Sequence, residues 1–151
     1  MLKVYAKTAR YVIDLNLFDT LTLVSGDSGT GKTFLCHSIQ VCKDVNMIKV
    51  KADNNMQYIV NVVNSLNDLR CLLQDGCPHL IFIDKMEQWD VVERKTAEDL
   101  ILSDLGQRVN YNYYVVMYRG VSRLGFVEPM YILDYSNNVF KFVVGGQHNS
   151  E

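Results

Sequence analysis

A glycine-rich stretch between an apolar run and a segment of helical spacing constrains this chain more than any other feature. In order, its residues are Gly26, Asp27, Ser28, Gly29, Thr30, Gly31, Lys32 and Thr33. They complete the pattern G-x-x-x-x-G-K-[ST]. Residues 21–25 before the stretch predict a strand, and residues 31–43 predict a helix with its apolar positions on one face. The sequence therefore predicts a strand, a loop and a helix in direct succession.

A loop of this composition suits a phosphate chain that lies against the backbone. Glycines provide the conformational freedom, and successive amide groups at the start of a helix create a site for anions. Lys32 would reach the β- and γ-phosphates, and the Thr33 hydroxyl would ligate Mg²⁺. We expect the eight residues of the stretch, together with Phe34, to bind the nucleotide. The alternative is a glycine-rich hairpin turn with an incidental Lys-Thr pair.

At these residues the chain resembles the P-loop NTPases, in which this loop is called Walker A. A second resemblance lies at residues 79–84, where four apolar residues precede Asp84. A continuous apolar run is typical of a strand buried on both faces of a parallel sheet, and ligands of open α/β sheets bind at the carboxyl ends of the strands. The stretch is similar to a Walker B strand, which implies that Asp84 holds the hydrated Mg²⁺. The alternative is a strand that merely ends in an aspartate.

The residues after Asp84 depart from the best-known ATPase pattern. Additional-strand ATPases such as the AAA+ proteins often place a glutamate directly after the metal-binding aspartate, to polarise the attacking water, and here the neighbour is Lys85. Glu87 is the nearest acid and is the candidate for that role; a solvent-facing glutamate is the alternative. The resemblance also implies a sensor of the γ-phosphate just beyond the strand predicted at residues 113–118. Arg119 is the first candidate and Arg123 the second, and a surface arginine is again the alternative.

The rest of the chain completes an α/β pattern. Its predicted elements are strands at 2–7 and 10–15 that form a hairpin, a strand at 45–50, a strand at 56–63, a helix at 65–74, a helix at 91–107, and strands at 126–134 and 139–144 that form a second hairpin. A single helix of about 20 residues is the alternative for the strand at 56–63 and the helix after it. We predict one domain over residues 1–151, with a three-layer P-loop NTPase fold. Its central sheet is mainly parallel, and an antiparallel hairpin is added from each terminus.

Composition sets the remaining expectations. The 151 residues are 48% hydrophobic, which suits one domain with a real core, and the net charge is −2. Because a sequence-independent nucleic-acid binder usually carries a basic face, nucleic acid is not the partner that this net charge indicates, although a local patch remains open. No apolar run is long enough for a membrane span, so we expect a cytoplasmic protein.

The leading functional hypothesis is a Mg²⁺-dependent ATP-binding protein that hydrolyses ATP slowly. Phosphoryl transfer requires mainly positioning and charge neutralisation, which we assign to Lys32, Glu87 and Arg119, with Thr33 and Asp84 at the metal. No arginine finger is evident, so a protein partner or a second copy of the chain is expected to supply it. The alternatives are a small-molecule or nucleotide kinase, and a nucleotide-binding switch without significant turnover.

Overall fold

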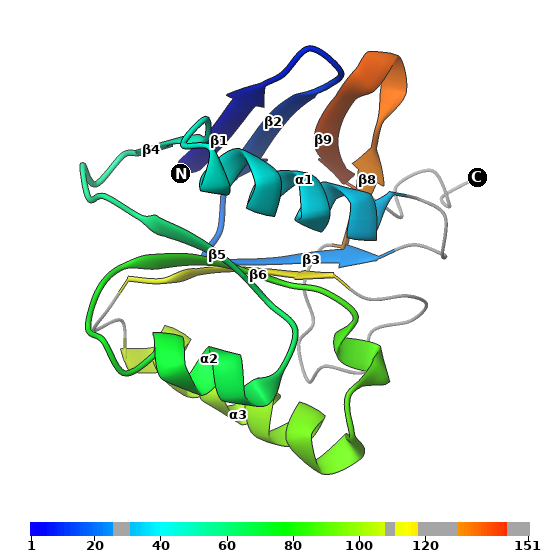
Figure 1. Ribbon diagram of the computed structural model, residues 1–151. Coiled ribbons are helices and arrows are strands. Elements are labelled where there is room, and N and C mark those ends of the chain that lie inside the picture. Colours follow the sequence, from blue (N-terminus) through cyan, green and yellow to red (C-terminus); the bar gives the residue numbers. More distant parts are fainter. Residues whose placement is uncertain (26–30, 108–110, 118–129, 145–151) are drawn as a thin grey trace.

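The computed structural model describes residues 1–25, 31–107, 111–117 and 130–144 (Figure 1). The strands are β1 (Leu2–Lys7), β2 (Val12–Leu17), β3 (Leu21–Ser25), β4 (Lys49–Ala52), β5 (Ile59–Val63), β6 (His79–Ile83), β7 (Tyr113–Met117), β8 (Met130–Asp134) and β9 (Val139–Val144). The helices are α1 (Lys32–Asp44), α2 (Leu66–Leu72) and α3 (Val91–Gln107), with short 3₁₀ turns η1 (Met86–Gln88) and η2 (Ser136–Asn138).

The described strands form one sheet in the order β4-β1-β2-β9-β8-β3-β7-β6-β5. The last five strands of this order, β8, β3, β7, β6 and β5, all run parallel and form the parallel core. β7 lies between β3, which leads into the glycine-rich stretch, and β6, which leads into Asp84. The carboxyl ends of β3 and β6 therefore meet at one edge of the sheet, one strand apart.

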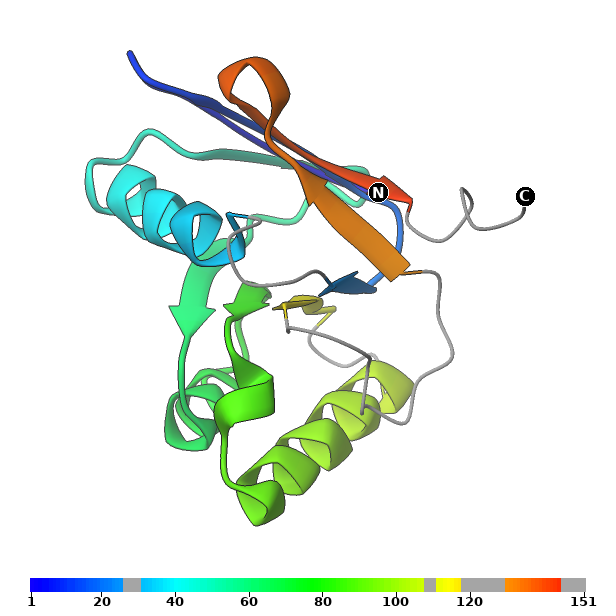
Figure 2. The same ribbon diagram turned by 90° about the vertical axis from the view of Figure 1, so that its right-hand side faces the viewer.

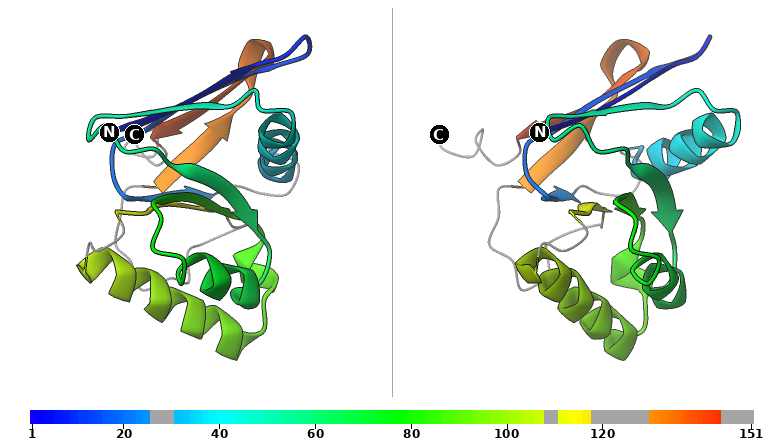
Figure 3. Two further views of the ribbon diagram at one scale, coloured as in Figure 1. Left: turned by 60° about the vertical axis from the view of Figure 1, so that its left-hand side comes forward. Right: turned by 90° about the vertical axis from the view of Figure 1, so that its left-hand side faces the viewer.

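The remaining four strands extend this core and curl over one of its faces. β9 pairs antiparallel with β8 and parallel with β2, while β1 pairs antiparallel with both β2 and β4. Figures 2 and 3 show α1 in the angle between this extension and the parallel core, while α2 and α3 cover the opposite face of the core. The sheet has the shape of a half-barrel, and α1 is covered on two sides.

Two clusters of buried side chains follow from this arrangement. The first joins α1, through Leu35 and Ile39, to the inward-facing residues of β1 and β2 and to one face of the parallel strands. The second lies on the other face, where α2 and α3 contribute Leu69 and Ile101. All five residues of β6 are buried, and they alternate between the two clusters apart from His79, as expected for a strand covered on both faces. The sequence prediction for this strand is thus confirmed.

Most of the predicted elements are present close to their predicted bounds. The strand at 21–25 and the helix at 91–107 match at both ends, and the strand at 59–63 followed by α2 shows that the single-helix alternative for this region was wrong. The turn between β8 and β9 contains Asn137 and Asn138, which both adopt positive φ. Asparagine adopts positive φ more often than most other residues that have a side chain.

The strand predicted at 45–50 needs a correction. Residues 45 and 46 form the turn that ends α1, and the strand β4 starts only at Lys49 and pairs with β1 at the outer edge of the sheet. Local apolar spacing indicated a strand here, but the position of the strand is set by its partner β1, which is about 45 residues earlier in the chain. The α/β class with a largely parallel set of central strands is as predicted; the continuous curled sheet that joins the two terminal hairpins was not. The prediction of one domain over residues 1–151 stays a prediction.

Candidate functional site

The glycine-rich stretch enters the described part of the structure at its last three residues. Gly31 precedes α1 with φ of 95°, a left-handed conformation that only glycine adopts without strain. α1 then begins at Lys32, so the free amide groups of its first turn face the carboxyl edge of the sheet. The predicted binding residues Gly26, Asp27, Ser28, Gly29 and Thr30 lie outside the described residues.

Lys32, Thr33 and Asp84 lie together at this edge. Lys32 is 8% exposed and Asp84 is 6% exposed, although both are charged residues of types that are rarely buried without a partner. The Thr33 hydroxyl donates a hydrogen bond to the Asp84 carboxylate, and the Lys32 ammonium is close enough to interact with it electrostatically. The sequence predicted these residues as one site, and the structure brings them together.

Burial is the main influence on the acidity of Asp84. Removal of the carboxylate from water raises its pKa above the ordinary value. The hydrogen bond from Thr33 and the charges of Lys85 and Lys32 lower this pKa, while the charge of Glu87 raises it, and the sum of all effects is an increase. Asp84 therefore carries a charge that the protein alone does not fully compensate, as expected for a carboxylate that takes up a cation.

An open cavity of about 480 Å³ adjoins these residues. The described residues that line it are Thr33, Asn64, Asp84, Lys85, Gln88 and Trp89. Asn64 and Gln88 were missed by the sequence analysis, because neither belongs to a motif. Asn64 directly follows β5, the strand that pairs with β6 in parallel, so its position at the carboxyl edge could have been inferred from strand adjacency. Both amides can donate hydrogen bonds to an anion or a water molecule in the cavity.

The turn after Asp84 has a strained backbone. Lys85 adopts φ of 60° and ψ of 33°, a left-handed conformation that is costly for a residue with a long side chain. The chain then forms η1, in which Arg94 from α3 holds the Glu87 carbonyl oxygen through a hydrogen bond of 3.1 Å from Nη1. Strain of this kind persists where the surrounding structure imposes it, often at functional sites.

Glu87 is near the site, and one of its carboxylate oxygens is unsatisfied. Its charge influences Asp84, so the two carboxylates are neighbours. The Oε1 atom of Glu87 is buried and has no hydrogen-bond partner among the described residues. Glu87 does not belong to the lining of the 480 Å³ cavity, in contrast to the adjacent Gln88. Arg119 and Arg123, the predicted sensors of the γ-phosphate, lie outside the described residues.

Phe34 belongs to an aromatic cluster at the start of α1. Its ring centroid lies 5.8 Å from that of Tyr11, 5.7 Å from that of Tyr135 and 5.4 Å from that of Phe140. These partners come from the hairpins of both termini, so the cluster attaches the first turn of α1 to the curled extension. Phe34 nevertheless remains 44% exposed, which leaves part of its ring open to a ligand.

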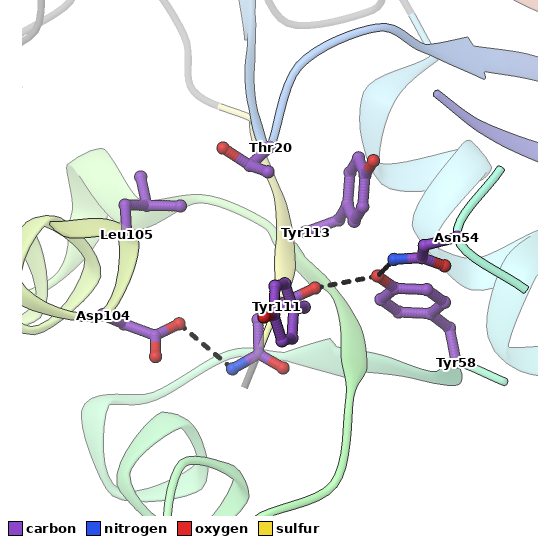
Figure 4. Close-up of a pocket in the computed structure, with 8 residues that line it drawn as sticks. Thr20, Asn54, Tyr58, Asp104, Leu105, Tyr111 and Tyr113 are labelled. Carbon is purple, nitrogen blue, oxygen red and sulfur yellow. Dashed lines mark hydrogen bonds between the residues drawn. The ribbon is translucent and has the colours of Figure 1, made fainter. Parts of the chain in front are cut away.

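A second cavity of about 160 Å³ lies at the opposite edge, beside the amino ends of β3, β5 and β7 (Figure 4). Its polar groups are occupied with one another. Tyr58 donates to the Tyr111 carbonyl oxygen at 3.0 Å, and Asn112 donates to Asp104 Oδ2 at 3.1 Å. These bonds hold the amino edge together, whereas near the carboxyl edge the buried Oε1 atom of Glu87 has no hydrogen-bond partner among the described residues.

The described residues contain neither a helix that could span a membrane nor a preformed cluster of metal ligands. Within the described ranges, every helix is too short or too polar to cross a bilayer. The same residues contain no group of three or more histidine, cysteine, aspartate and glutamate side chains that could hold a metal ion. A cation at Asp84 would therefore depend on the hydroxyl of Thr33 and on oxygens from a ligand, which is how Mg²⁺ is usually bound with phosphates.

The comparison with known families agrees with this geometry. The sequence model of the ATPase family associated with various cellular activities (AAA) matches residues 22–109, which is more than half of the chain. The matched range contains the glycine-rich stretch, α1 and Asp84. No curated protein and no solved structure matches the chain significantly. AAA proteins are P-loop NTPases that generally bind and hydrolyse ATP. The chain belongs to the AAA family.

Proposed function

We propose that the chain is a Mg²⁺-dependent ATP-binding protein that hydrolyses ATP slowly. The observation that carries the proposal is the buried arrangement of Lys32 and Asp84 with the hydrogen bond from the Thr33 hydroxyl to the Asp84 carboxylate. Lys32 and the amide groups at the start of α1 can bind the phosphates of a metal-bound triphosphate. The Thr33 hydroxyl and the Asp84 carboxylate can bind its metal ion.

The residues at the carboxyl edge have the chemistry that Mg²⁺ requires. Mg²⁺ prefers hard oxygen ligands and retains several water molecules, and Thr33 and Asp84 supply a hydroxyl and a carboxylate. When bound, the ion would neutralise negative charge on the phosphates. In this proposal Thr33 ligates the ion directly, and Asp84 holds it through its water shell.

The other residues bind and orient the substrate. Lys32 contacts the β- and γ-phosphates, while the backbone of residues 26–31 and the exposed part of the Phe34 ring bind the rest of the nucleotide. Glu87 orients the attacking water through its unsatisfied oxygen, and Arg119 contacts the γ-phosphate. Arg119 follows the end of β7 by two residues in the sequence, and β7 ends at the same edge of the sheet as β3 and β6.

Slow turnover follows from the residue after Asp84. Lys85 occupies the position directly behind the metal-binding carboxylate, and it cannot accept a proton from water while it is charged. Glu87 must act from η1, three positions further along, and its carboxylate lies outside the cavity lining. We therefore assign full activity to an assembly, in which a protein partner or a second copy of the chain contributes an arginine to the phosphates.

Release of phosphate from ATP tests this assignment when wild type is compared with Glu87→Gln. We expect the variant to bind Mg·ATP with unchanged affinity and to lose at least tenfold in turnover, because general-base catalysis contributes about 10²- to 10⁴-fold. Glu93→Gln, which alters an exposed glutamate in the first turn of α3, is the matched control and should keep wild-type turnover.

The same assay separates the other candidate functions. ADP formation that requires a hydroxyl acceptor and releases no phosphate would identify a kinase. Tight binding with no ADP formation, alone or at high protein concentration, would identify a nucleotide-dependent switch. Unchanged turnover in Glu87→Gln would remove Glu87 from the mechanism and leave the amides of Asn64 and Gln88 as the groups near the attacking water.

A further inference from the structure

The outward-facing side of the curled extension carries a strong excess of positive charge. On the four strands of the extension and on the adjoining β8, side chains that point away from α1 include two aspartates, Asp14 opposite Tyr5 and Asp134 opposite Lys141, and five lysines. We call these lysines the basic sheet face; they are Lys3, Lys7, Lys49, Lys51 and Lys141, and all five are exposed. The whole chain has 15 basic and 17 acidic residues, so the remainder of the protein is clearly acidic.

The alternation of burial in β1 defines this face. Leu2, Val4 and Ala6 are buried against α1, whereas Lys3, Tyr5 and Lys7 are exposed. In β4, the register pairs Lys51 with Lys3 and Lys49 with Tyr5. Figure 1 shows β1 and β2 on the side of α1 opposite to the parallel core, so this surface lies away from the proposed nucleotide site.

Two lysines of the face are direct cross-strand neighbours. Lys3 and Lys51 occupy opposite positions on antiparallel strands, where Cβ atoms are about 5 Å apart and like charges destabilise the sheet. Among the described residues, the ion pairs join other groups, including Lys95 to Asp99 and the amino group of Met1 to Asp53, and none involves the five lysines. The unbound protein thus retains a repulsion that a bound anion would relieve.

Protection of the sheet edge accounts for only part of this charge. Lysines on an edge strand prevent pairing with another chain, which is a sufficient reason for Lys49 and Lys51 on β4. It does not apply to Lys3, because β1 pairs on both sides at this residue, whereas the pairing with β4 stops at Tyr5, before Lys7. It does not apply to Lys141 either, because β9 lies between β2 and β8, but this lysine lies opposite Asp134 on β8, which offsets its charge.

We propose that the basic sheet face binds a single strand of nucleic acid. Lysines two residues apart on one strand are separated by about 6.8 Å, and neighbouring strands by about 4.8 Å, so the face offers a two-dimensional array of cations to a phosphate backbone. Tyr5 is 41% exposed between Lys3 and Lys7 and opposite Lys49. Asp14 on β2 lies on its other side, so the ring has lysines on three sides and one aspartate on the fourth. An exposed aromatic ring beside several cations is an arrangement on which bases stack while their phosphates are neutralised.

This placement explains why the net charge of the chain did not indicate the partner. The average over 151 residues combines an acidic body with a basic surface, and only the pairing of β4 with β1 brings Lys49 and Lys51 next to Lys3. The proposal does not depend on ATP binding, because it requires only residues of the extension.

Fluorescence anisotropy with a labelled oligothymidylate of about 20 nucleotides tests the proposal in about 50 mM salt. The test variant is the double substitution Lys3→Gln/Lys51→Gln. The matched control, Arg70→Gln/Lys95→Gln, removes the same charge from exposed positions on α2 and α3. We expect the test variant to bind at least tenfold more weakly than wild type, and the control to stay within about twofold.

Two further readouts distinguish a nucleic-acid site from general loss of charge. The slope of log affinity against log salt should fall by about 1.4 in the test variant, since each phosphate contact on a single strand contributes about 0.7. Tyr5→Ala should weaken binding by roughly tenfold without a change in this slope. Thermal unfolding verifies that each variant folds, and removal of the Lys3–Lys51 repulsion should leave the test variant at least as stable as wild type.

Three results would overturn the proposal. The first is absence of oligothymidylate binding by the wild type at low salt. The second is an equal loss of affinity in the test and control variants. The third is binding of a labelled acidic peptide of the same charge as tightly as the oligonucleotide, with no effect of Tyr5→Ala, which would assign the face to an acidic protein instead.

Discussion

Asn in place of Asp84 should make the nucleotide-free protein more stable while it removes Mg²⁺-dependent ATP binding. Asp84 is 6% exposed, and burial raises its pKa despite the hydrogen bond from Thr33 and the charges of Lys32 and Lys85. A raised pKa means that the charged form is disfavoured in the folded state relative to the unfolded chain. Asp84→Asn keeps the shape of the side chain and removes this charge.

The expected gain is about 1 kcal/mol in the free energy of unfolding, the size of stabilisation seen when a costly functional group is replaced. For a chain of this length, that corresponds to an increase of about 2–4 °C in Tm. The gain should depend on pH in a defined direction. Below the unfolded pKa, about 3.9, the carboxyl is protonated in both states and the charge costs nothing, so wild type and variant should converge. The difference should grow as the pH rises through the folded pKa of Asp84.

Asp104→Asn is the matched control at the opposite edge of the sheet. Asp104 Oδ2 accepts hydrogen bonds from the Tyr114 hydroxyl at 2.6 Å and from Asn112 at 3.1 Å. Loss of the carboxylate charge weakens both bonds, so this variant should lose about 1–2 kcal/mol and retain ATP binding. Thermal unfolding followed by circular dichroism, with and without Mg·ATP, measures both properties in both variants.

The two aspartates should therefore respond with opposite signs. ATP should raise the Tm of wild type and of Asp104→Asn through binding to the folded state, and should leave the Tm of Asp84→Asn unchanged. A Tm of Asp84→Asn below that of wild type at neutral pH would refute the account of Asp84 as an uncompensated buried charge. An undiminished increase in Tm with Mg·ATP in this variant would refute its role at the metal.

Three further substitutions test the geometry around the site. Lys85→Gly should raise stability by about 1 kcal/mol in urea unfolding, because glycine adopts the left-handed backbone of this position freely, whereas Lys85→Ala should give no such gain. Tyr114→Phe should lower Tm by about 4–8 °C, since it removes a buried hydrogen bond to a carboxylate worth about 2 kcal/mol. Leu35→Ala should lower the free energy of unfolding by about 3 kcal/mol in urea, because α1 is covered on two sides. Val41→Ala, at an exposed position on the same helix, should lower it by less than 1 kcal/mol. Equal losses in the two variants would contradict the half-barrel arrangement.

The sequence was most informative where a local pattern is tied to one structure. The glycine-rich stretch between β3 and α1 predicted both neighbouring elements, because its pattern is typical of a loop between a strand and a helix; the structure has α1 starting at Lys32, directly after Gly31 with positive φ. The apolar run before Asp84 predicted a strand buried on both faces, because a continuous apolar run is typical of such strands. Both predictions rest on patterns formed by a few consecutive residues.

Local sequence patterns did not predict which distant strands pair with each other. The parallel pairing of β2 with β9, which joins the two terminal hairpins into one sheet, connects residues more than 120 positions apart. The pairing of β4 with β1 displaced the strand predicted at 45–50 to Lys49–Ala52. Apolar spacing shows that a segment is a strand, but the partner and the exact register depend on packing against the rest of the fold.

The same limit applies to the candidate site. Lys32, Thr33 and Asp84 were recognised from motifs, whereas Asn64 and Gln88 line the cavity only because β5 pairs with β6 and because η1 turns back beside Asp84. Adjacency of strands at a sheet edge is a property of the fold, and it adds polar groups that no spacing in the sequence reveals. The basic sheet face arises in the same way, from the register of β4 against β1.

Isothermal titration of Mg·ATP into wild type, Lys32→Ala and Lys43→Ala tests most directly whether this edge of the sheet is a nucleotide site. Lys43 lies in the last turn of α1 and serves as the control for removal of a lysine from the same helix. Truncation of one member of a buried charge pair costs about 2–5 kcal/mol, so Lys32→Ala should bind roughly 30-fold to several-thousand-fold more weakly, and Lys43→Ala should bind like wild type. An affinity of Lys32→Ala within about threefold of wild type, in a variant that circular dichroism shows to be folded, would contradict nucleotide binding at this site.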